Sequence, residues 1–124
     1  MKKERLHGNC HCGLVQFSIP RSLDMSAVRR CDCSLCKRRG AIMLACPIKD
    51  VEIENGAENL VHYKWNTKVA THHFCSKSGI LTHYQRRITP RICGINIACC
   101  VEIDNCSIQD AQMNKGVEPS LVEK

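Results

Sequence analysis

The segment Cys31–Asp32–Cys33–Ser34–Leu35–Cys36 places three thiols within six residues. Three thiolates suffice to hold one metal ion, and the C-x-x-C half has the spacing of many zinc knuckles. Three protein ligands with one open position are typical of a catalytic zinc, whereas a structural zinc is closed by four. The segment therefore predicts an open zinc site at Cys31, Cys33 and Cys36, and with it a fold stabilised by metal.

A second pair of thiols lies in Cys10–His11–Cys12, between Gly8 and Gly13. Residues i and i+2 of a strand stand about 7 Å apart, but the sulfurs of a tetrahedral zinc site lie only about 3.8 Å apart. The pair can therefore chelate one ion only where the backbone bends, which the flanking glycines permit.

Two ligands must recruit others, and Cys75 with position 78 has suitable spacing. Position 78 is serine, whose neutral hydroxyl is a poor zinc ligand. We therefore expect a second zinc site at Cys10, Cys12 and Cys75, weakened by the departure at Ser78. Its fourth ligand could be water, a spare cysteine or one of the histidines His72, His73 and His83. Alternatively, the site could stand empty.

The composition favours a reduced, metal-binding domain over a disulfide scaffold. The 124 residues fit one domain, and 11 cysteines with only 4% aromatic residues call for stabilisation by metal. The residues from 1 to 10 are charged without an apolar stretch, which argues against a signal peptide, and no run approaches the ~18 apolar residues of a membrane helix. We expect a cytoplasmic protein that binds one or two zinc ions and does not bind a membrane.

The remaining thiols and the net charge carry less information. Five cysteines are expected to be small buried hydrophobes: Cys46, Cys93, Cys99, Cys100 and Cys106. The formal charge of +6 counts every thiol as neutral, so zinc-thiolate binding would reduce it. With few aromatic residues for base stacking, this modest excess argues against a nucleic-acid partner.

Short β-favouring runs separated by turn signals dominate the chain and predict a mainly β fold. We expect a turn at Asn55–Gly56 and another at Asn66–Thr67. The expected strands span residues 13–19, 41–46, 51–54, 60–65, 69–74, 80–84 and 94–103.

Helices are expected to be few and short, with candidates at residues 34–39 and 108–114. The domain is predicted to span residues 1–105, followed by a polar tail at 106–124 that wraps the surface or frays.

Basic side chains flank the first cysteine cluster. Lys37, Arg38 and Arg39 follow it directly, and Arg29 and Arg30 precede it. Arginine suits carboxylate recognition, so as a group these residues are candidates for substrate binding, although each alone could be a solvated surface charge.

The six histidines and the aromatic residues give weaker signals. His11 and His73 are candidates for positions next to a metal ligand, whereas Tyr63 and Trp65 are expected in the core or a pocket wall. His62, like His72 and His83, could equally have an ordinary structural role.

Taken together, these motifs resemble the glutathione-dependent formaldehyde-activating enzymes, a family that includes the domain of centromere protein V. The resemblance runs from about residue 6 to 103 and rests on four stretches, which are His7–Gly8–Asn9–Cys10–His11–Cys12–Gly13, Cys31 to Ala41, His73–Phe74–Cys75 with Gly79, and Ile95 to Cys99. It implies an Mss4-like arrangement of coiled antiparallel sheets stapled by zinc, with a structural zinc at Cys10, Cys12 and Cys75 and an activity-linked zinc at Cys31, Cys33 and Cys36.

The resemblance also implies a zinc-dependent carbon–sulfur lyase that interconverts S-hydroxymethylglutathione with glutathione and formaldehyde. The alternative is a non-catalytic zinc module that binds a protein or nucleic-acid partner. A third interpretation is a zinc reserve or redox sensor, in which spare thiols release metal on oxidation.

Overall fold

The computed structural model describes residues 4–31, 34–64, 70–85, 91–100, 102–103 and 112–114 of the chain. Within these ranges one α-helix, α1, spans Ser34–Arg39, and none of the described helices is long and apolar enough to cross a membrane. The strands are β1 Arg5–Asn9, β2 Gln16–Pro20, β3 Arg29–Cys31, β4 Met43–Pro47, β5 Glu52–Asn55, β6 Leu60–Tyr63, β7 Thr71–Cys75, β8 Leu81–Gln85, β9 Ile92–Asn96 and β10 Gln112–Asn114. Short 3₁₀ turns cover Met25–Ala27, Ile48–Asp50, Ala57–Asn59 and Ile97–Cys99.

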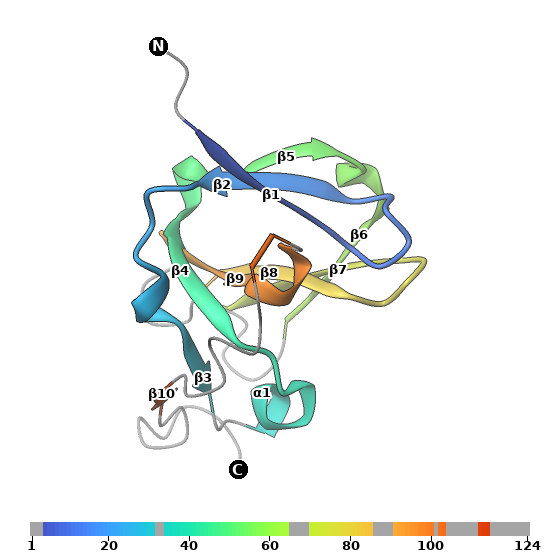
Figure 1. Cartoon of the computed structure of the whole chain (residues 1–124). Helices are drawn as coiled ribbons and strands as arrows, with labels where there is room; N and C mark the ends of the chain where they lie inside the picture. Colours follow the sequence, from blue (N-terminus) through green and yellow to red (C-terminus); the bar gives the residue numbers. More distant parts are fainter. Residues whose placement is uncertain are drawn as a thin grey trace.

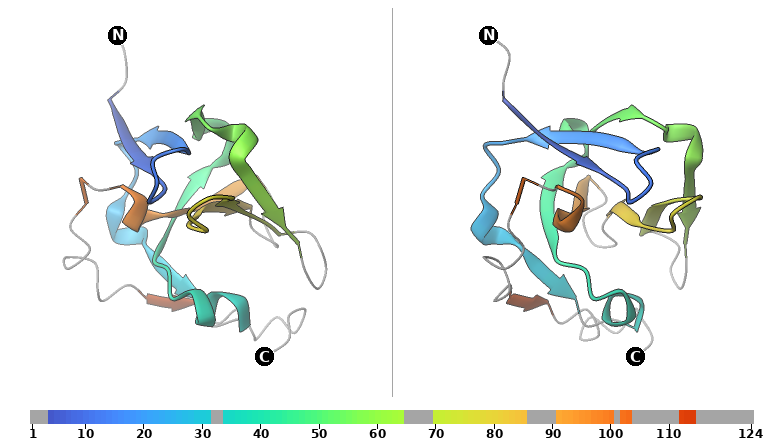
Figure 2. Two further views of the ribbon diagram at one scale, coloured as in Figure 1. Left: turned by 90° about the vertical axis from the view of Figure 1, so that its right-hand side faces the viewer. Right: turned by 45° about the vertical axis from the view of Figure 1, so that its right-hand side comes forward.

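The strands form two sheets, which confirms the mainly β prediction. A three-stranded sheet has the order β1-β2-β5, and a seven-stranded sheet has the order β10-β3-β4-β9-β8-β7-β6. Neighbouring strands are antiparallel except for β10 and β3, which run parallel. The smaller sheet covers one side of the larger, and α1 lies on the other side (Figures 1 and 2).

Apolar side chains fill the space between the two sheets. Phe17 and Ile19 of β2 meet Leu44 of β4 and Ile95 of β9, and all four are almost completely buried. Four cysteines join this cluster, which confirms their prediction as buried hydrophobes; they are Cys46, Cys93, Cys99 and Cys100. Cys106 lies outside the described residues.

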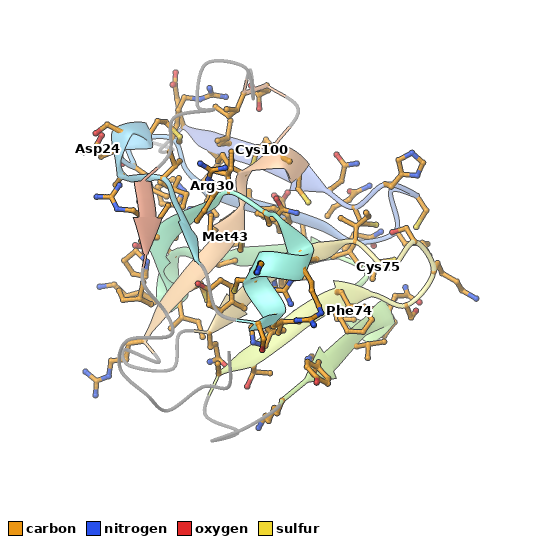
Figure 3. All side chains as sticks on the ribbon, turned by 90° about the horizontal axis from the view of Figure 1, so that it is seen from below. Asp24, Arg30, Met43, Phe74, Cys75 and Cys100 are labelled. Atoms are coloured by element: carbon orange, nitrogen blue, oxygen red, sulfur yellow. The ribbon has the colours of Figure 1, made fainter. Side chains whose placement is uncertain are left out.

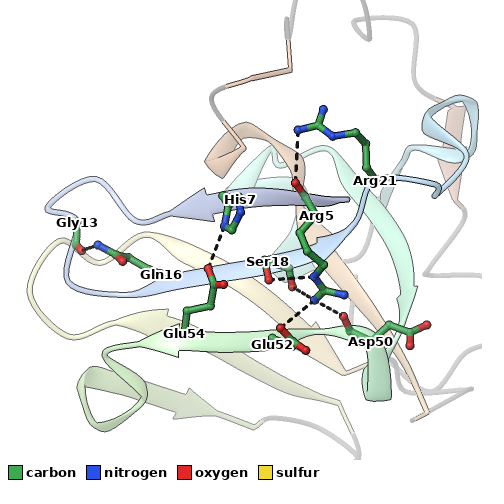
Figure 4. A network of polar contacts seen from close by, with 9 residues as sticks. All are labelled: Arg5, His7, Gly13, Gln16, Ser18, Arg21, Asp50, Glu52 and Glu54. Carbon is green, nitrogen blue, oxygen red and sulfur yellow. Dashed lines mark hydrogen bonds and ion pairs between the residues drawn. The ribbon is translucent and has the colours of Figure 1, made fainter. Parts of the chain in front are cut away.

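Polar contacts tie the outer strands of the smaller sheet together. The Arg5 guanidinium donates hydrogen bonds to the Ser18 hydroxyl at 3.1 Å and to the Asp50 carbonyl at 2.8 Å (Figure 4). On the same sheet, His7 Nδ1 lies 3.0 Å from Glu54 Oε1. These contacts join β1, β2 and the segment entering β5.

The two faces of the larger sheet have different neighbours, because strand residues alternate in direction. One cross-strand row contains His62, His73, His83, Ile95 and Leu44, and its last two members point into the core between the sheets. The opposite row contains Tyr63, His72, Tyr84, Gly94 and Ala45. This second row faces α1, which stands in front of the sheet when it is viewed from below (Figure 3).

Most expected elements are present with shifted ends. The helix at 34–39 is confirmed, as is the turn after β5, where Gly56 adopts φ of +80°. The strand expected from residue 13 begins at Gln16, and those expected at 41–46 and 80–84 each begin later by one or two residues. The turn expected at Asn66–Thr67 lies outside the described residues.

Several expectations about elements are wrong. The strand expected over 94–103 ends at Asn96, because its side chain accepts a hydrogen bond from the Ala98 N–H and caps a 3₁₀ turn. The described part of the helix expected at 108–114 is instead β10, which supplies backbone partners to β3 at the sheet edge. β1 and β3 were not expected from the sequence. The domain boundary at residue 105 stays a prediction.

Candidate metal centre

Two tight turns face each other at one end of the molecule and bring three cysteines together. In the first turn, the Gly13 N–H bonds to the Cys10 carbonyl at 3.1 Å, so the chain reverses at once. In the second, the Gly79 N–H bonds to the Cys75 carbonyl at 2.8 Å. The bend expected between residues 10 and 13 is thus present.

The spacing of these sulfurs fits a metal ion that prefers thiolates. Cys12 Sγ lies 3.6 Å from Cys10 Sγ and 3.6 Å from Cys75 Sγ, and all three lie within 4.8 Å of one another. Four thiolates around Zn²⁺ stand about 3.8 Å apart, so little movement is needed to bind the ion. Cys10 and Cys75 are buried and Cys12 is exposed, which leaves the cluster reachable from solvent on one side.

Hydrogen-bond donors favour the thiolate form of two of the cysteines. The Ser78 hydroxyl and backbone N–H are the main causes that lower the pKa of Cys75 to about 6. Burial opposes ionisation of Cys10, but the Val15 N–H, 3.4 Å from its sulfur, together with the Ser78 and Cys12 side chains, holds its pKa below the usual value. The donor set therefore suits a cation that binds thiolates.

Within the described part of the chain, no histidine completes this cluster. The group of close potential ligands contains three cysteines and no histidine nitrogen. His73 and His83 stack on each other in the row that runs into the core, with ring centroids 4.4 Å apart, and His73 Nδ1 lies 2.6 Å from His62 Nδ1. Burial is the main cause that lowers the pKa of His73 to about 4 and of His83 to about 3, so both are neutral near pH 7.

The structure describes only part of the segment that contains the first cysteine cluster. Cys36 is half-buried in the middle of α1. Cys33 and the side chain of Cys31 lie outside the described residues. The zinc site predicted at Cys31, Cys33 and Cys36 therefore stays a prediction.

The basic residues that follow this cluster differ sharply in their surroundings. Lys37 and Arg38 are exposed, and Arg38 Nη1 donates to the Ser34 carbonyl of its own helix at 2.9 Å. Arg39 is half-buried, and its Nη1 lies 3.2 Å from His72 Nδ1 on β7. Since a guanidinium only donates, His72 Nδ1 accepts and the imidazole proton sits on Nε2.

His72 is itself held in place by an aromatic neighbour, an arrangement that was not expected from the sequence. Its side chain is buried and stacks on Tyr84 with ring centroids 5.1 Å apart and an interplanar angle of 17°. The strand registers that pair His72 with Tyr63 and with Tyr84 bring these rings together, and the strand patterns in the sequence do not reveal those registers. Tyr63, expected in the core or a pocket wall, is 46% exposed because β6 is the edge strand; Trp65 lies outside the described residues.

The fold and the cysteine cluster together define a small mainly β protein with a site suited to a thiophilic metal ion. The chain matches the sequence model of the glutathione-dependent formaldehyde-activating enzymes over residues 5–115. The protein therefore belongs to this family, as its motifs indicated. The family description supports an activity that involves glutathione and formaldehyde.

A solved structure agrees with this assignment. The crystal structure of a Rhodobacter sphaeroides protein shares 38% sequence identity with this chain and superposes with a TM-score of 0.83. The match covers 87% of this chain and 99% of the other. The two proteins share one fold over nearly all of their length.

Proposed function

We propose that this protein is a zinc-dependent carbon–sulfur lyase that acts on a thiol–aldehyde adduct such as S-hydroxymethylglutathione. In the cleavage direction the C–S bond breaks and its electron pair stays on sulfur. The hydroxyl proton leaves and the C–O bond becomes a carbonyl, so no oxidant or reductant is needed. The pairing of glutathione with formaldehyde in the family description supports this substrate class.

The proposed reaction site is the cluster of Cys31, Cys33 and Cys36, with one zinc ion. When bound there, Zn²⁺ would stabilise the substrate sulfur as a thiolate. Cys10, Cys12 and Cys75 would hold a second zinc. Because thiolates at both sites must stay reduced, we assign the protein to the cytoplasm.

The observation that carries the proposal is the position of Arg39. Residues i and i+3 are neighbours on a helix surface, so Arg39 lies beside Cys36 on α1. Among the three basic residues of this helix, only Arg39 is half-buried. A guanidinium offers five N–H donors in a planar fork that matches a carboxylate, so Arg39 can bind a glutathione carboxylate next to the predicted metal site.

His72 is assigned as a positioning residue for Arg39. Its Nδ1 accepts from the guanidinium, and stacking on Tyr84 holds the ring in one orientation. Since Nδ1 is already engaged, His72 orients the arginine rather than accepting a proton from the substrate. Lys37 and Arg38, exposed on the same helix, add positive charge that attracts an anionic substrate.

The test measures how fast zinc-loaded protein exchanges S-hydroxymethylglutathione with glutathione and formaldehyde, by proton NMR exchange spectroscopy. Arg39→Gln removes the proposed carboxylate contact, whereas Arg38→Gln removes an equal charge whose contact lies within its own helix. A charge-assisted hydrogen bond is worth about 1.5–3 kcal/mol, so Arg39→Gln should raise KM about 10- to 100-fold. Arg38→Gln should change KM about twofold or less.

Two results would contradict the proposal. If the zinc-loaded wild-type protein does not accelerate exchange above the rate with glutathione alone, the lyase assignment is wrong and a non-catalytic zinc module becomes the better interpretation. If Arg38→Gln and Arg39→Gln raise KM equally, the position of Arg39 does not matter and the carboxylate assignment fails.

A further inference from the structure

Ser78 stands beside two sulfurs of the Cys10–Cys12–Cys75 site, those of Cys10 and Cys75. Its Oγ is buried and forms no well-directed hydrogen bond within the described part of the chain. Its nearness lowers the pKa values of Cys75 and Cys10, and its backbone N–H lies 3.5 Å from Cys75 Sγ. A buried hydroxyl without a hydrogen-bond partner among the described residues thus stands beside the candidate thiolate ligands.

The chemistry of this hydroxyl distinguishes the site from a closed zinc site. A structural zinc is closed by four protein ligands, but here the described residues supply three sulfurs and no histidine nitrogen. Three thiolates around Zn²⁺ leave one net negative charge, and a hydroxyl that donates to sulfur stabilises that charge. A neutral hydroxyl that donates a hydrogen bond to sulfur stabilises the ligands from outside the coordination shell and is itself a poor ligand.

The surroundings allow a small molecule to reach the remaining position. Cys12 is exposed, as are Ser76, Lys77 and Gly79 in the opposing turn. Lys77 brings a positive charge to the turn that contains Ser78, which favours an anionic ligand. Soft sulfur ligands match a metal already held by thiolates.

We propose that the Cys10–Cys12–Cys75 site binds zinc through three protein thiolates and takes a low-molecular-weight thiol from solution as its fourth ligand. Ser78 acts as a hydrogen-bond donor to the protein sulfurs. The incoming thiol releases its proton to solvent, its sulfur binds the metal, and a solvent ligand leaves; no electrons are transferred. This thiol site is separate from the proposed reaction site and does not depend on lyase activity.

The experiment uses the full chain loaded with ¹¹³Cd, whose NMR resonance moves downfield with each added sulfur ligand. The resonance of this site is assigned as the one that shifts in Ser78→Cys, where a fourth protein sulfur closes the site. On addition of 2-mercaptoethanol, that resonance should move downfield in the wild type and in Ser78→Ala, and stay unchanged in Ser78→Cys. Zinc transfer to a chelator should be at least about tenfold faster from the wild type than from Ser78→Cys.

Each alternative outcome has a definite meaning. A wild-type resonance that does not respond to millimolar thiol overturns the proposal. A response to thiol in Ser78→Ala without one in the wild type would make the Ser78 oxygen a ligand and also overturn it. The cadmium resonance of the proposed reaction site at Cys31, Cys33 and Cys36 is a separate signal. Its response to added thiol therefore tests the lyase proposal independently.

Discussion

Gly94→Ala tests whether the face of the larger sheet beneath α1 is packed as the structure shows. Gly94 of β9 lies directly opposite Tyr84 of β8, and a Cβ built on Gly94 would stand 2.5 Å from Tyr84 Cε1 and 3.0 Å from its Cζ. Carbon atoms in contact prefer about 3.5–4.0 Å. The Tyr84 ring must therefore move, and its other face is stacked on His72.

The cost follows from two opposing effects. Overpacking a site without room costs about 1–3 kcal/mol, whereas replacing glycine by alanine in a compatible strand stabilises by about 0.4–1 kcal/mol through the unfolded chain. The net loss should be about 1–2 kcal/mol. For a domain of this length, that lowers Tm by about 4–8 °C. Tilting Tyr84 also releases His72, so KM for the adduct should rise.

A double-mutant cycle with Tyr84→Ala separates the clash from any general effect of the substitution. Unfolding of the zinc-loaded proteins is followed by circular dichroism in urea. Without the Tyr84 ring, Gly94→Ala should be neutral or slightly stabilising. If it destabilises the protein equally in both backgrounds, the close approach of Gly94 to Tyr84 does not limit this position and the reasoning is refuted.

Gly56→Ala should lower the free energy of unfolding by at least about 2 kcal/mol, because φ is +80° and an added Cβ would collide with the Leu14 carbonyl. Gly13→Ala should lower it by only about 1 kcal/mol, because φ is +83° but the space around the added Cβ is open. Equal losses of Tm in the two variants would contradict this. Burial holds the pKa of His83 at about 3, below its ordinary 6.5, so the unfolded chain takes up the proton first as pH falls. Stability should therefore drop from pH 6.5 towards 3 by up to about 1.4 kcal/mol per unit, and urea titrations of His83→Gln should show a shallower slope; an unchanged slope would refute this. Burial raises the pKa of four thiols to about 11 or 12, and these are Cys46, Cys93, Cys99 and Cys100. Brief alkylation of the native protein, followed by mass spectrometry, should therefore label them slowly. Fast labelling would show that they are not buried.

Local signals in the sequence predicted the elements whose form depends on nearby residues. The alternation that ends at Asn55–Gly56 located β5 and its turn, because glycine tolerates the left-handed conformation there. β3 and β10 could not be found in this way, because each is three residues long and exists through pairing with a distant segment. Strands this short carry too little pattern to be recognised.

The ligand set of the second site followed from spacing, whereas its surroundings did not. Cysteines two residues apart beside Gly13, with Cys75 as a third ligand, predicted the cluster that the structure brings together. The burial of the Ser78 hydroxyl beside two sulfurs depends on how two turns from distant parts of the chain face each other. Zinc-ligand spacing is a local property, but the orientation of a hydroxyl outside the ligand set is a tertiary one.

The sequence by itself determined the mainly β class, the family and the thiols that can bind metal, because strand periodicity and cysteine spacing are written within a few residues. Only the tertiary structure decided which of three adjacent basic residues turns inward. Arg39 meets His72 because the register of β7 against β8 puts His72 on the face beneath α1, stacked on Tyr84. A register shift of one residue would place His73 on that face instead. Register is set by packing between distant segments, so no local pattern in residues 37–39 could have specified that contact.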